Sequence, residues 1–169
     1  MPNKKQPALL TEREAYDYAL KRLSIRDYSQ KDLEGKLRLR GCPSLIIAKV
    51  MGKLLDYNFI NEEGFGQKVY NYWLSKKYYG RQHLRLDLMK KQVREDLIPA
   101  IVNQLSHAEE EQRAQAFAQS VLRRKDKKYA PDNIKARAAM ARALSSRGFG
   151  SGIISGILAE IYNNHTEMS

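Results

Sequence analysis

A pattern of six apolar positions occurs three times along the chain and constrains its fold more than any other feature of the sequence. Adding 51 to the residue numbers of the first copy gives the second copy, and adding 107 gives the third. The three copies are Leu33, Leu37, Cys42, Ile47, Val50 and Leu54; Leu84, Leu88, Val93, Ile98, Ile101 and Leu105; and Met140, Leu144, Phe149, Ile154, Ile157 and Ile161. Apolar residues recur at helical spacing and never alternate over the length of a strand, which predicts an all-α protein. The repetition predicts a tandem array of three three-helix, helix-turn-helix-like repeats, elongated and curved.

The first repeat contains the signals that start and stop its three helices. A first helix over 13–26 is followed by Ser29, an N-cap residue for the second helix. Gly41 is predicted to end the second helix as the left-handed residue of a Schellman motif. Ser44 is then predicted to cap the third helix.

The repeats predict a flexible N-terminal tail over 1–10, repeats over 11–60, 61–107 and 108–162, and a C-terminal tail over 163–169. Asn61 is predicted to cap the next helix, with Ile60 and Phe65 forming a hydrophobic staple. Gln92 stands where the other repeats have glycine. It must adopt a left-handed backbone, at a cost of about 1–2 kcal/mol, or end its helix in another way. The third repeat is predicted to begin near Glu110.

The glycine-rich segment RGFGSGIISG, residues 147–156, is similar at first sight to a phosphate-binding loop. Its alignment with RGCPSLIIAKV at 40–50 places it at the corner between the second and third helices of a repeat. Gly148 then has the role of Gly41, and Ser151 has that of Ser44. No strand is predicted before these glycines, as nucleotide-binding loops require. The segment is interpreted as a helical corner, and no cofactor is predicted.

The charge of the chain bears on its partners. It has 30 lysine and arginine residues against 19 aspartate and glutamate residues, a formal net charge of +11 in 169 residues. This favours a polyanionic partner, nucleic acid first. No apolar run reaches the roughly 18 residues that span a membrane, and the first ten residues lack the apolar core of a signal peptide. We expect a cytoplasmic monomer without a membrane partner. The single cysteine, Cys42, fits a reducing compartment and has no partner at metal-site spacing.

Four segments resemble, in order, the successive blocks of the RecX family, regulatory proteins of the bacterial RecA recombinase. They are YALKRLSIRDYSQKDLEGKLRLRG at 18–41, NFINEEGF at 58–65, YGRQHLRLDLMKKQV at 79–93 and ARALSSRGFGSGIISGIL at 141–158. The resemblance covers most of the chain, and the first block is its most specific part. Two residues depart from the family pattern: Gly66, where the family usually has alanine, and Gln92, where it usually has glycine. Both departures suggest a looser second repeat.

The resemblance implies a function in DNA repair, homologous recombination and the SOS response. It implies a protein that binds RecA and RecA–DNA filaments in the filament groove and mainly inhibits recombinase, ATPase and strand-exchange activity. The alternative is a stand-alone, basic helical-repeat protein that binds single- or double-stranded DNA without RecA. A third possibility is a helical scaffold whose charge serves solubility.

Basic clusters are the candidate contacts with RecA or DNA. Any one cluster can also be a solvated helix face. They consist of Lys36, Arg38 and Arg40; Lys76, Lys77 and Arg81; Arg85, Lys90, Lys91 and Arg94; and Arg123, Arg124, Lys125, Lys127 and Lys128. The last cluster is the best single candidate because it adjoins a predicted loop, which could follow a phosphate backbone or an acidic protein surface. Tyr72 and Tyr78 are candidates for stacking on bases.

Two other kinds of site are disfavoured by the residues themselves. A helix-turn-helix that reads base edges is disfavoured because the third helix begins with Leu45, Ile46 and Ile47, which offer no side-chain hydrogen bonds and are predicted to be buried. Catalysis is disfavoured because the three histidines lie far apart in sequence and no nucleophile has a recognisable base partner. We therefore expect a non-enzyme without catalytic or metal-binding residues.

Overall fold

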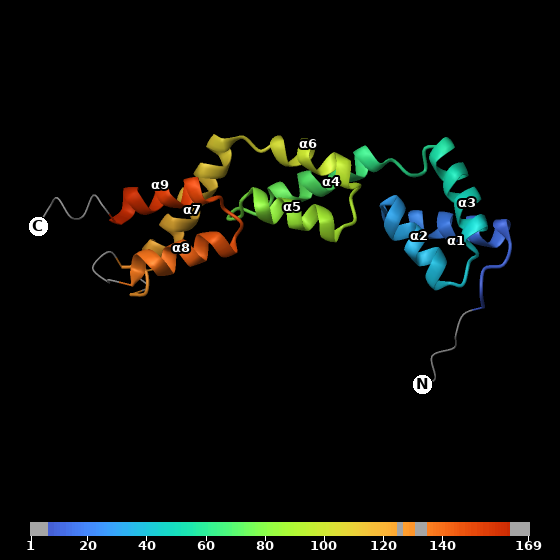
Figure 1. The fold of residues 1–169 in the computed structure, drawn as a ribbon, viewed down its shortest axis with the longest axis horizontal. Coiled ribbons are helices and arrows are strands. Elements are labelled where there is room, and N and C mark those ends of the chain that lie inside the picture. The colour runs from blue at the N-terminus through green and yellow to red at the C-terminus, as the bar shows by residue number, and fades with distance from the viewer. Residues whose placement is uncertain (1–6, 125–126, 131–134, 163–169) are drawn as a thin grey trace, which may run out of the picture. The chain divides into compact units, whose positions relative to one another are not determined.

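The computed structural model describes residues 7–124, 127–130 and 135–162. Every regular element within these residues is a helix, which confirms the predicted all-α class (Figure 1). The elements are α1 (Glu12–Leu23), α2 (Gln30–Leu39), α3 (Ser44–Asp56), α4 (Glu62–Leu74), α5 (Arg81–Lys90), the short 3-10 helix η1 (Glu95–Leu97), α6 (Ile98–Asn103), α7 (His107–Arg123), α8 (Ala136–Ser146) and α9 (Ser151–Tyr162).

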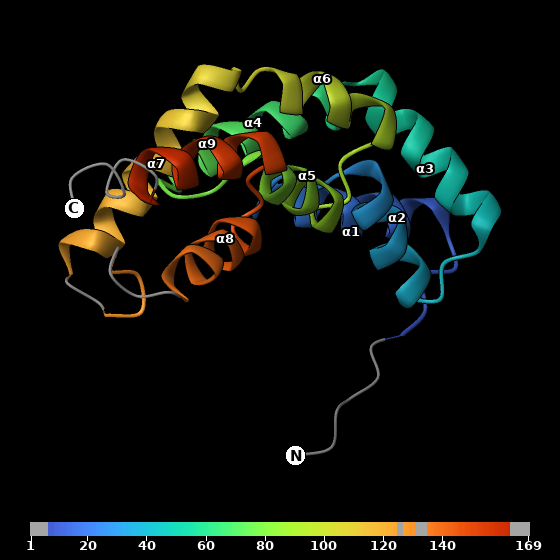
Figure 2. The ribbon, with the colours of Figure 1, turned by 60° about the vertical axis from the view of Figure 1, so that its left-hand side comes forward.

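The chain forms two compact units. The first comprises Met1–Val69 and Met89–Leu97, and the second comprises Tyr70–Leu88 and Ile98–Ser169. In the first unit α1, α2 and α3 pack against one another, and in the second α7, α8 and α9 do so (Figure 2). Each of these groups has its own apolar core. The predicted boundaries of the three repeats stay a prediction.

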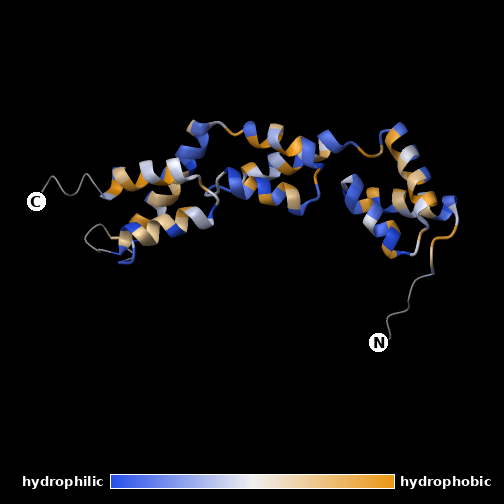
Figure 3. Ribbon diagram, in the orientation of Figure 1, coloured by the Kyte–Doolittle hydropathy of each residue, from blue (hydrophilic) through white to orange (hydrophobic). Residues whose placement is uncertain are grey.

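The repeated apolar positions supply most of the buried side chains. All six positions of the first copy and all six of the second are buried. In the third copy Ile154 and Ile161 are half-buried at the edge of the core. Ile153 and Leu158 are buried in α9 instead, so the buried stripe of this helix runs beside the predicted one. Figure 3 shows hydrophobic and hydrophilic residues mixed along the helices, as expected for helices that bury one face.

The helix stops follow the prediction. Gly41 has φ +71, its N–H donates to Arg38 O at 2.9 Å, and the next N–H donates to Leu37 O at 3.2 Å. These are the two hydrogen bonds of a Schellman motif. Gly148, with φ +79, ends α8 in the same way. Gln92 adopts φ +58, so the second of these corners also uses a left-handed residue.

The predicted helix starts are correct at two positions and wrong at two. Ser29 accepts a hydrogen bond from Asp32 N at 3.1 Å, and Asn61 Oδ1 accepts one from Gly64 N at 2.7 Å. Ser44 is not a cap: α3 begins at Ser44 itself, because the preceding Pro43 is extended and occupies the N-cap position. Likewise α9 begins at Ser151.

Three further expectations differ from the structure. Leu9, placed in a flexible tail, is buried in the core of the first unit, and its N–H donates to Arg40 O at 3.1 Å. The helix expected to begin near Glu110 begins at His107, because Ser106 and Glu109 form a capping box. Leu45, expected to be buried, is 70% exposed at the start of α3.

Two buried glutamates each hold the N-terminus of an earlier helix. Glu62, at the start of α4, accepts a hydrogen bond from Gln30 N, the first residue of α2. Glu110, in the first turn of α7, accepts one from Arg81 N, the first residue of α5, at 2.8 Å. Both carboxylates therefore satisfy N–H groups that have no partner within their own helices.

Candidate nucleic-acid interface

Two of the predicted cations are held by contacts within the fold. Arg81 donates from its guanidinium to Leu105 O, and its Nε lies 3.4 Å from a carboxylate oxygen of the buried Glu110. Arg40 donates to Pro7 O at 2.9 Å, and its guanidinium carbon lies 4.9 Å from the centre of the Tyr18 ring. Both side chains have structural contacts, so their charge is less available to a partner.

Three other predicted cations are neutralised by nearby carboxylates. Lys76 pairs with Asp87, and Arg94 Nε lies 2.7 Å from Asp96 Oδ1. Lys36 lies 3.9 Å from an Asp32 oxygen, one helical turn away. Ion pairs of this kind on a surface contribute little to stability, and a phosphate group can compete with the carboxylate.

Most of the remaining candidates are exposed. They are Arg38 in α2; Lys77 before α5; Arg85, Lys90 and Lys91 in and after α5; and Arg123, Arg124, Lys127 and Lys128 at and after the end of α7. Lys125 lies outside the described residues. The cluster at 123–128 therefore places four described cations on the surface of the second unit. Its assignment as a contact site stays a prediction.

The two stacking candidates lie in different environments. Tyr72 is 71% exposed on α4 and offers its ring to solvent. Tyr78 packs against the apolar core of the second unit, where its ring centre lies 6.1 Å from that of Phe117. Tyr72 is therefore free to stack on a base, whereas Tyr78 presents only part of its ring.

Two arginines outside the predicted set also have defined positions. Arg113 in α7 donates to Leu74 O at 3.0 Å and lies over the Trp73 ring, and burial lowers the pKa of its guanidinium. Arg147, at the end of α8, stacks on Phe117 with its guanidinium carbon 3.8 Å from the ring centre. Arg147 could have been found from the repeat, because it occupies the position of Arg40. Nothing in the local sequence distinguishes Arg113.

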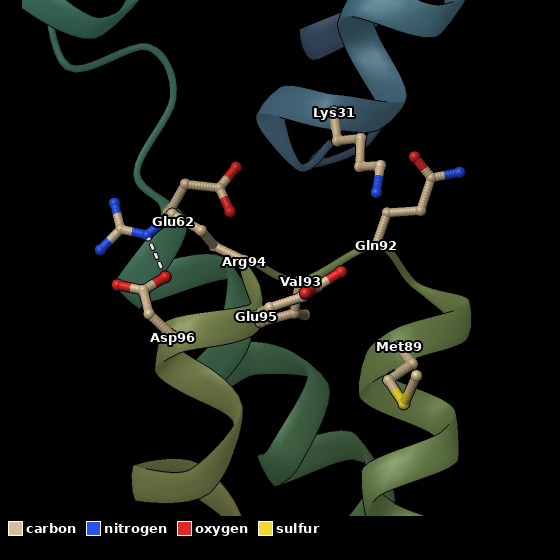
Figure 4. A pocket seen from close by; sticks show the side chains of 8 residues that line it. All are labelled: Lys31, Glu62, Met89, Gln92, Val93, Arg94, Glu95 and Asp96. Atoms are coloured by element: carbon tan, nitrogen blue, oxygen red, sulfur yellow. Dashed lines mark hydrogen bonds and ion pairs between the residues drawn. The ribbon is translucent and has the colours of Figure 1, made fainter.

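A cleft of about 520 Å³ lies in the first unit beside the end of α5 (Figure 4). Lys31 from α2 extends toward Gln92, while Arg94 and Asp96 face one another on the other side. Glu62 and Glu95 also line the cleft. Because carboxylates offset the cations here, this cleft is poorly suited to a polyanion.

Groups capable of catalysis or metal binding are sparse. Within the described residues there is no cluster of three or more histidine, cysteine, aspartate or glutamate side chains suited to a metal ion. His83 accepts a hydrogen bond from Trp73 Nε1 at 2.9 Å, and burial lowers its pKa. Burial raises the pKa of the Cys42 thiol, which disfavours the reactive thiolate. In the parts of the chain that the structure describes, no helix is both long and apolar enough to cross a membrane.

Comparison with known proteins gives a consistent result. Residues 15–54 match the family model described as RecX, first three-helix domain. The chain is similar to the regulatory protein RecX of Mycolicibacterium smegmatis, with 26% identity over 161 residues, covering 92% of this chain and 84% of that protein. It is 25% identical to the regulatory protein RecX of Chlorobium limicola, covering 91% and 93% of the two chains. The crystal structure of RecX from Lactobacillus salivarius has the same fold, with a TM-score of 0.77, 21% identity and coverage of 89% of this chain and 96% of that one.

Proposed function

Because the chain belongs to the RecX family, we propose that it binds RecA and RecA–DNA filaments and mainly inhibits recombinase, ATPase and strand-exchange activity. The observation that carries this proposal is the similarity to regulatory RecX proteins over about nine tenths of the chain. The exposed cations on both units support it, since a filament of protein and nucleic acid presents phosphates and acidic side chains. In this proposal the chain acts as a monomer, without catalysis of its own.

A second candidate is a nucleic-acid-binding protein that acts without RecA. The net charge of +11 favours it independently of the family, because phosphate contacts alone give sequence-independent binding. The two candidates differ in a measurable quantity. A RecA regulator binds RecA-coated DNA more tightly than naked DNA at the same salt concentration, whereas a stand-alone binder does not.

The experiment measures the DNA-dependent ATPase and strand-exchange activity of RecA with increasing amounts of this protein. We expect both activities to fall at amounts well below one molecule per RecA. Binding to RecA-coated and to naked DNA is measured in parallel at equal salt. Unchanged RecA activities at equimolar ratio and low salt, together with tight binding to naked DNA, would favour the second candidate. No binding to either target would leave a scaffold whose charge serves solubility.

A further inference from the structure

Two small cavities lie at equivalent positions in the first and third three-helix groups. The cavity in the first unit measures about 220 Å³ and is lined by Tyr18, Lys21, Arg22, Ile25 and Arg40. The cavity in the second unit measures about 190 Å³ and is lined by Tyr78, Phe117, Ser120, Val121, Arg124, Tyr129 and Arg147. Neither lining includes a carboxylate.

The equivalence of the cavities follows from the buried residues of the two groups. Ala15 and Ala19 of α1 correspond to Ala114 and Ala118 of α7, all four of them buried. This register pairs each lining residue of α1 with a lining residue of α7: Tyr18 with Phe117, Lys21 with Ser120, Arg22 with Val121, and Ile25 with Arg124. The apolar repeat pairs α2 with α8, and so places Arg147 at the position of Arg40.

The same contact orders one arginine in each cavity. Arg40 lies over Tyr18, and Arg147 lies over Phe117. Stacking on a ring fixes the plane of a guanidinium while its N–H groups, which lie in that plane, can still donate. Arg147 uses one of them to donate to Ala143 O at 3.3 Å. The Nε of Arg40 is buried without an acceptor in the described part of the chain, and a buried donor of this kind calls for a partner.

The remaining polar groups add positive charge and hydrogen-bond donors. In the first cavity Arg22 Nε donates to the Tyr18 hydroxyl at 3.1 Å, which holds this second guanidinium beside the ring. Lys21 is exposed at its edge. In the second cavity the exposed Arg124 adds a cation, and Ser120 and Tyr129 add hydroxyl groups. Lys21 and Arg124 form no ion pair within the described residues.

We propose that both cavities bind phosphate groups of a nucleic-acid backbone. Each is smaller than the roughly 300 Å³ of a typical small-molecule site, and so accepts one phosphodiester group rather than a whole nucleotide. Guanidinium groups bind phosphate oxygens through paired hydrogen bonds. A polymer with one phosphate per unit can occupy both cavities, and the net charge of +11 favours a polyanion over a single phosphorylated side chain. The inference rests on the proposed function only in that DNA is part of the proposed target.

The test compares two double variants of equal charge in the full chain. Lys21→Gln with Arg124→Gln removes one exposed cation from each cavity. Lys49→Gln with Arg123→Gln removes exposed cations of α3 and α7 that line neither cavity. Each pair lowers the net charge by two, so overall charge cannot explain a difference between them. Circular dichroism and thermal melting verify that both variants keep the parent fold.

Binding to a labelled single-stranded oligonucleotide is measured by fluorescence anisotropy over a series of salt concentrations. We expect the cavity variant to bind about tenfold more weakly, with a slope of log affinity against log salt that is shallower by about two, one for each lost phosphate contact. The control variant should stay within about twofold of the parent. Equal affinities and slopes for the two variants would overturn the proposal.

Two further probes identify the ligand. On an oligonucleotide with an uncharged methylphosphonate backbone, the cavity variant and the control variant should bind alike, and a persisting difference would overturn phosphate recognition. A phosphorylated peptide or inorganic phosphate should displace the oligonucleotide only at far higher concentration than unlabelled DNA. Displacement by the peptide at lower concentration than DNA would instead indicate a phosphoprotein ligand and overturn the assignment to nucleic acid.

The outcome is independent of the RecA experiment. Inhibition of RecA by the parent, with equal DNA binding by the two variants, would leave the proposed function standing and refute the phosphate cavities. The opposite pair of results would refute RecA regulation and leave the cavities standing.

Discussion

At the scale of single residues, three equivalent helix ends use a left-handed backbone in different surroundings. A Cβ atom added at Gly41 would lie 3.1 Å from the Ala8 Cβ, a contact that a small shift relieves. A Cβ atom at Gly148 would lie 2.3 Å from His83 N, because the corner packs directly on the start of α5. Gly80 N and Gln82 N donate to Arg147 O and Gly148 O at 3.0 Å across this contact. Gly148 is therefore required for close approach as well as for its φ angle.

We predict that Gly148→Ala lowers the free energy of unfolding by about 3 kcal/mol, since a left-handed alanine costs about 1–2 kcal/mol and the backbone clash adds to it. Urea denaturation, followed by the fluorescence of the single tryptophan, measures the loss. Gly150→Ala is the matched control: nothing lies within 4 Å of its added Cβ, and the midpoint should stay close to that of the parent. Equal midpoints for Gly148→Ala and the parent would contradict the packing of this corner.

Gln92 predicts a change in the opposite direction. Its φ of +58 is unfavourable for a residue with a side chain, so Gln92→Gly should raise the free energy of unfolding by about 1 kcal/mol. The same substitution at the exposed Gln119, within α7, should lower it by about 1 kcal/mol, because glycine is a poor helix former. Urea midpoints of the two variants should therefore lie on opposite sides of the parent's.

His83 predicts a dependence of stability on pH. Burial lowers its pKa, so the fold favours the neutral ring, which accepts the Trp73 N–H. Its contribution to stability is complete above the unfolded pKa of about 6.5 and is lost as the pH falls through the lower folded value. Urea unfolding at pH 7.5 and at pH 5, followed by Trp73 emission, should give a lower midpoint at pH 5. His83→Gln should reduce this difference, whereas His107→Gln should leave it intact.

At the scale of helices, the two buried glutamates show how one helix fixes the start of another. Glu62 is 7% exposed and Glu110 is 4% exposed, and each accepts from the first backbone N–H of a helix about 30 residues earlier. The favourable charge at the helix start offsets the cost of burying a carboxylate. Each contact lies within a single compact unit and ties α2 to α4, or α5 to α7.

We predict that Glu110→Ala lowers the free energy of unfolding by about 2–4 kcal/mol, because it removes the acceptor for Arg81 N and the partner of the Arg81 guanidinium. Thermal melting by circular dichroism measures this effect. Glu111→Ala, the same change at the next and more exposed residue of α7, should cost less than about 1 kcal/mol. Similar losses for the two variants would argue against a capping role for Glu110.

The sequence allowed prediction of those features of the helices that depend on neighbouring residues. Gly41 and Gly148 as stops, Ser29 and Asn61 as caps, and most of the buried positions depend on local chemistry and helical period. The cations could not be sorted in this way. Arg81 and Arg85 look alike in sequence, yet Arg81 turns inward toward Leu105 and Glu110, which lie more than 20 residues away. Ser44 failed as a cap because Pro43 fixes an extended backbone before it.

At the scale of the whole molecule, exposed positive charge occurs on both compact units. Arg38, Lys90 and Lys91 belong to the first unit, and the cluster at 123–128 belongs to the second. The formal charge of +11 attracts any polyanion over the distance of a Debye length, about 10 Å at moderate salt. A test of the predicted cluster must therefore separate its position from its contribution to the net charge.

We predict that reversing Arg123, Arg124, Lys127 and Lys128 to glutamate weakens inhibition of RecA ATPase and strand exchange at least tenfold, because direct contacts and local attraction are both lost. Helical content and melting temperature should not change, since these side chains are exposed. The matched control reverses four exposed cations outside the predicted clusters, Arg13, Lys31, Lys49 and Arg142, and lowers the net charge by the same eight units. It should retain most of the inhibition at moderate salt, where long-range attraction is screened. Equal losses for the two variants would show that net charge alone governs binding, and would remove the cluster at 123–128 from the candidate interface.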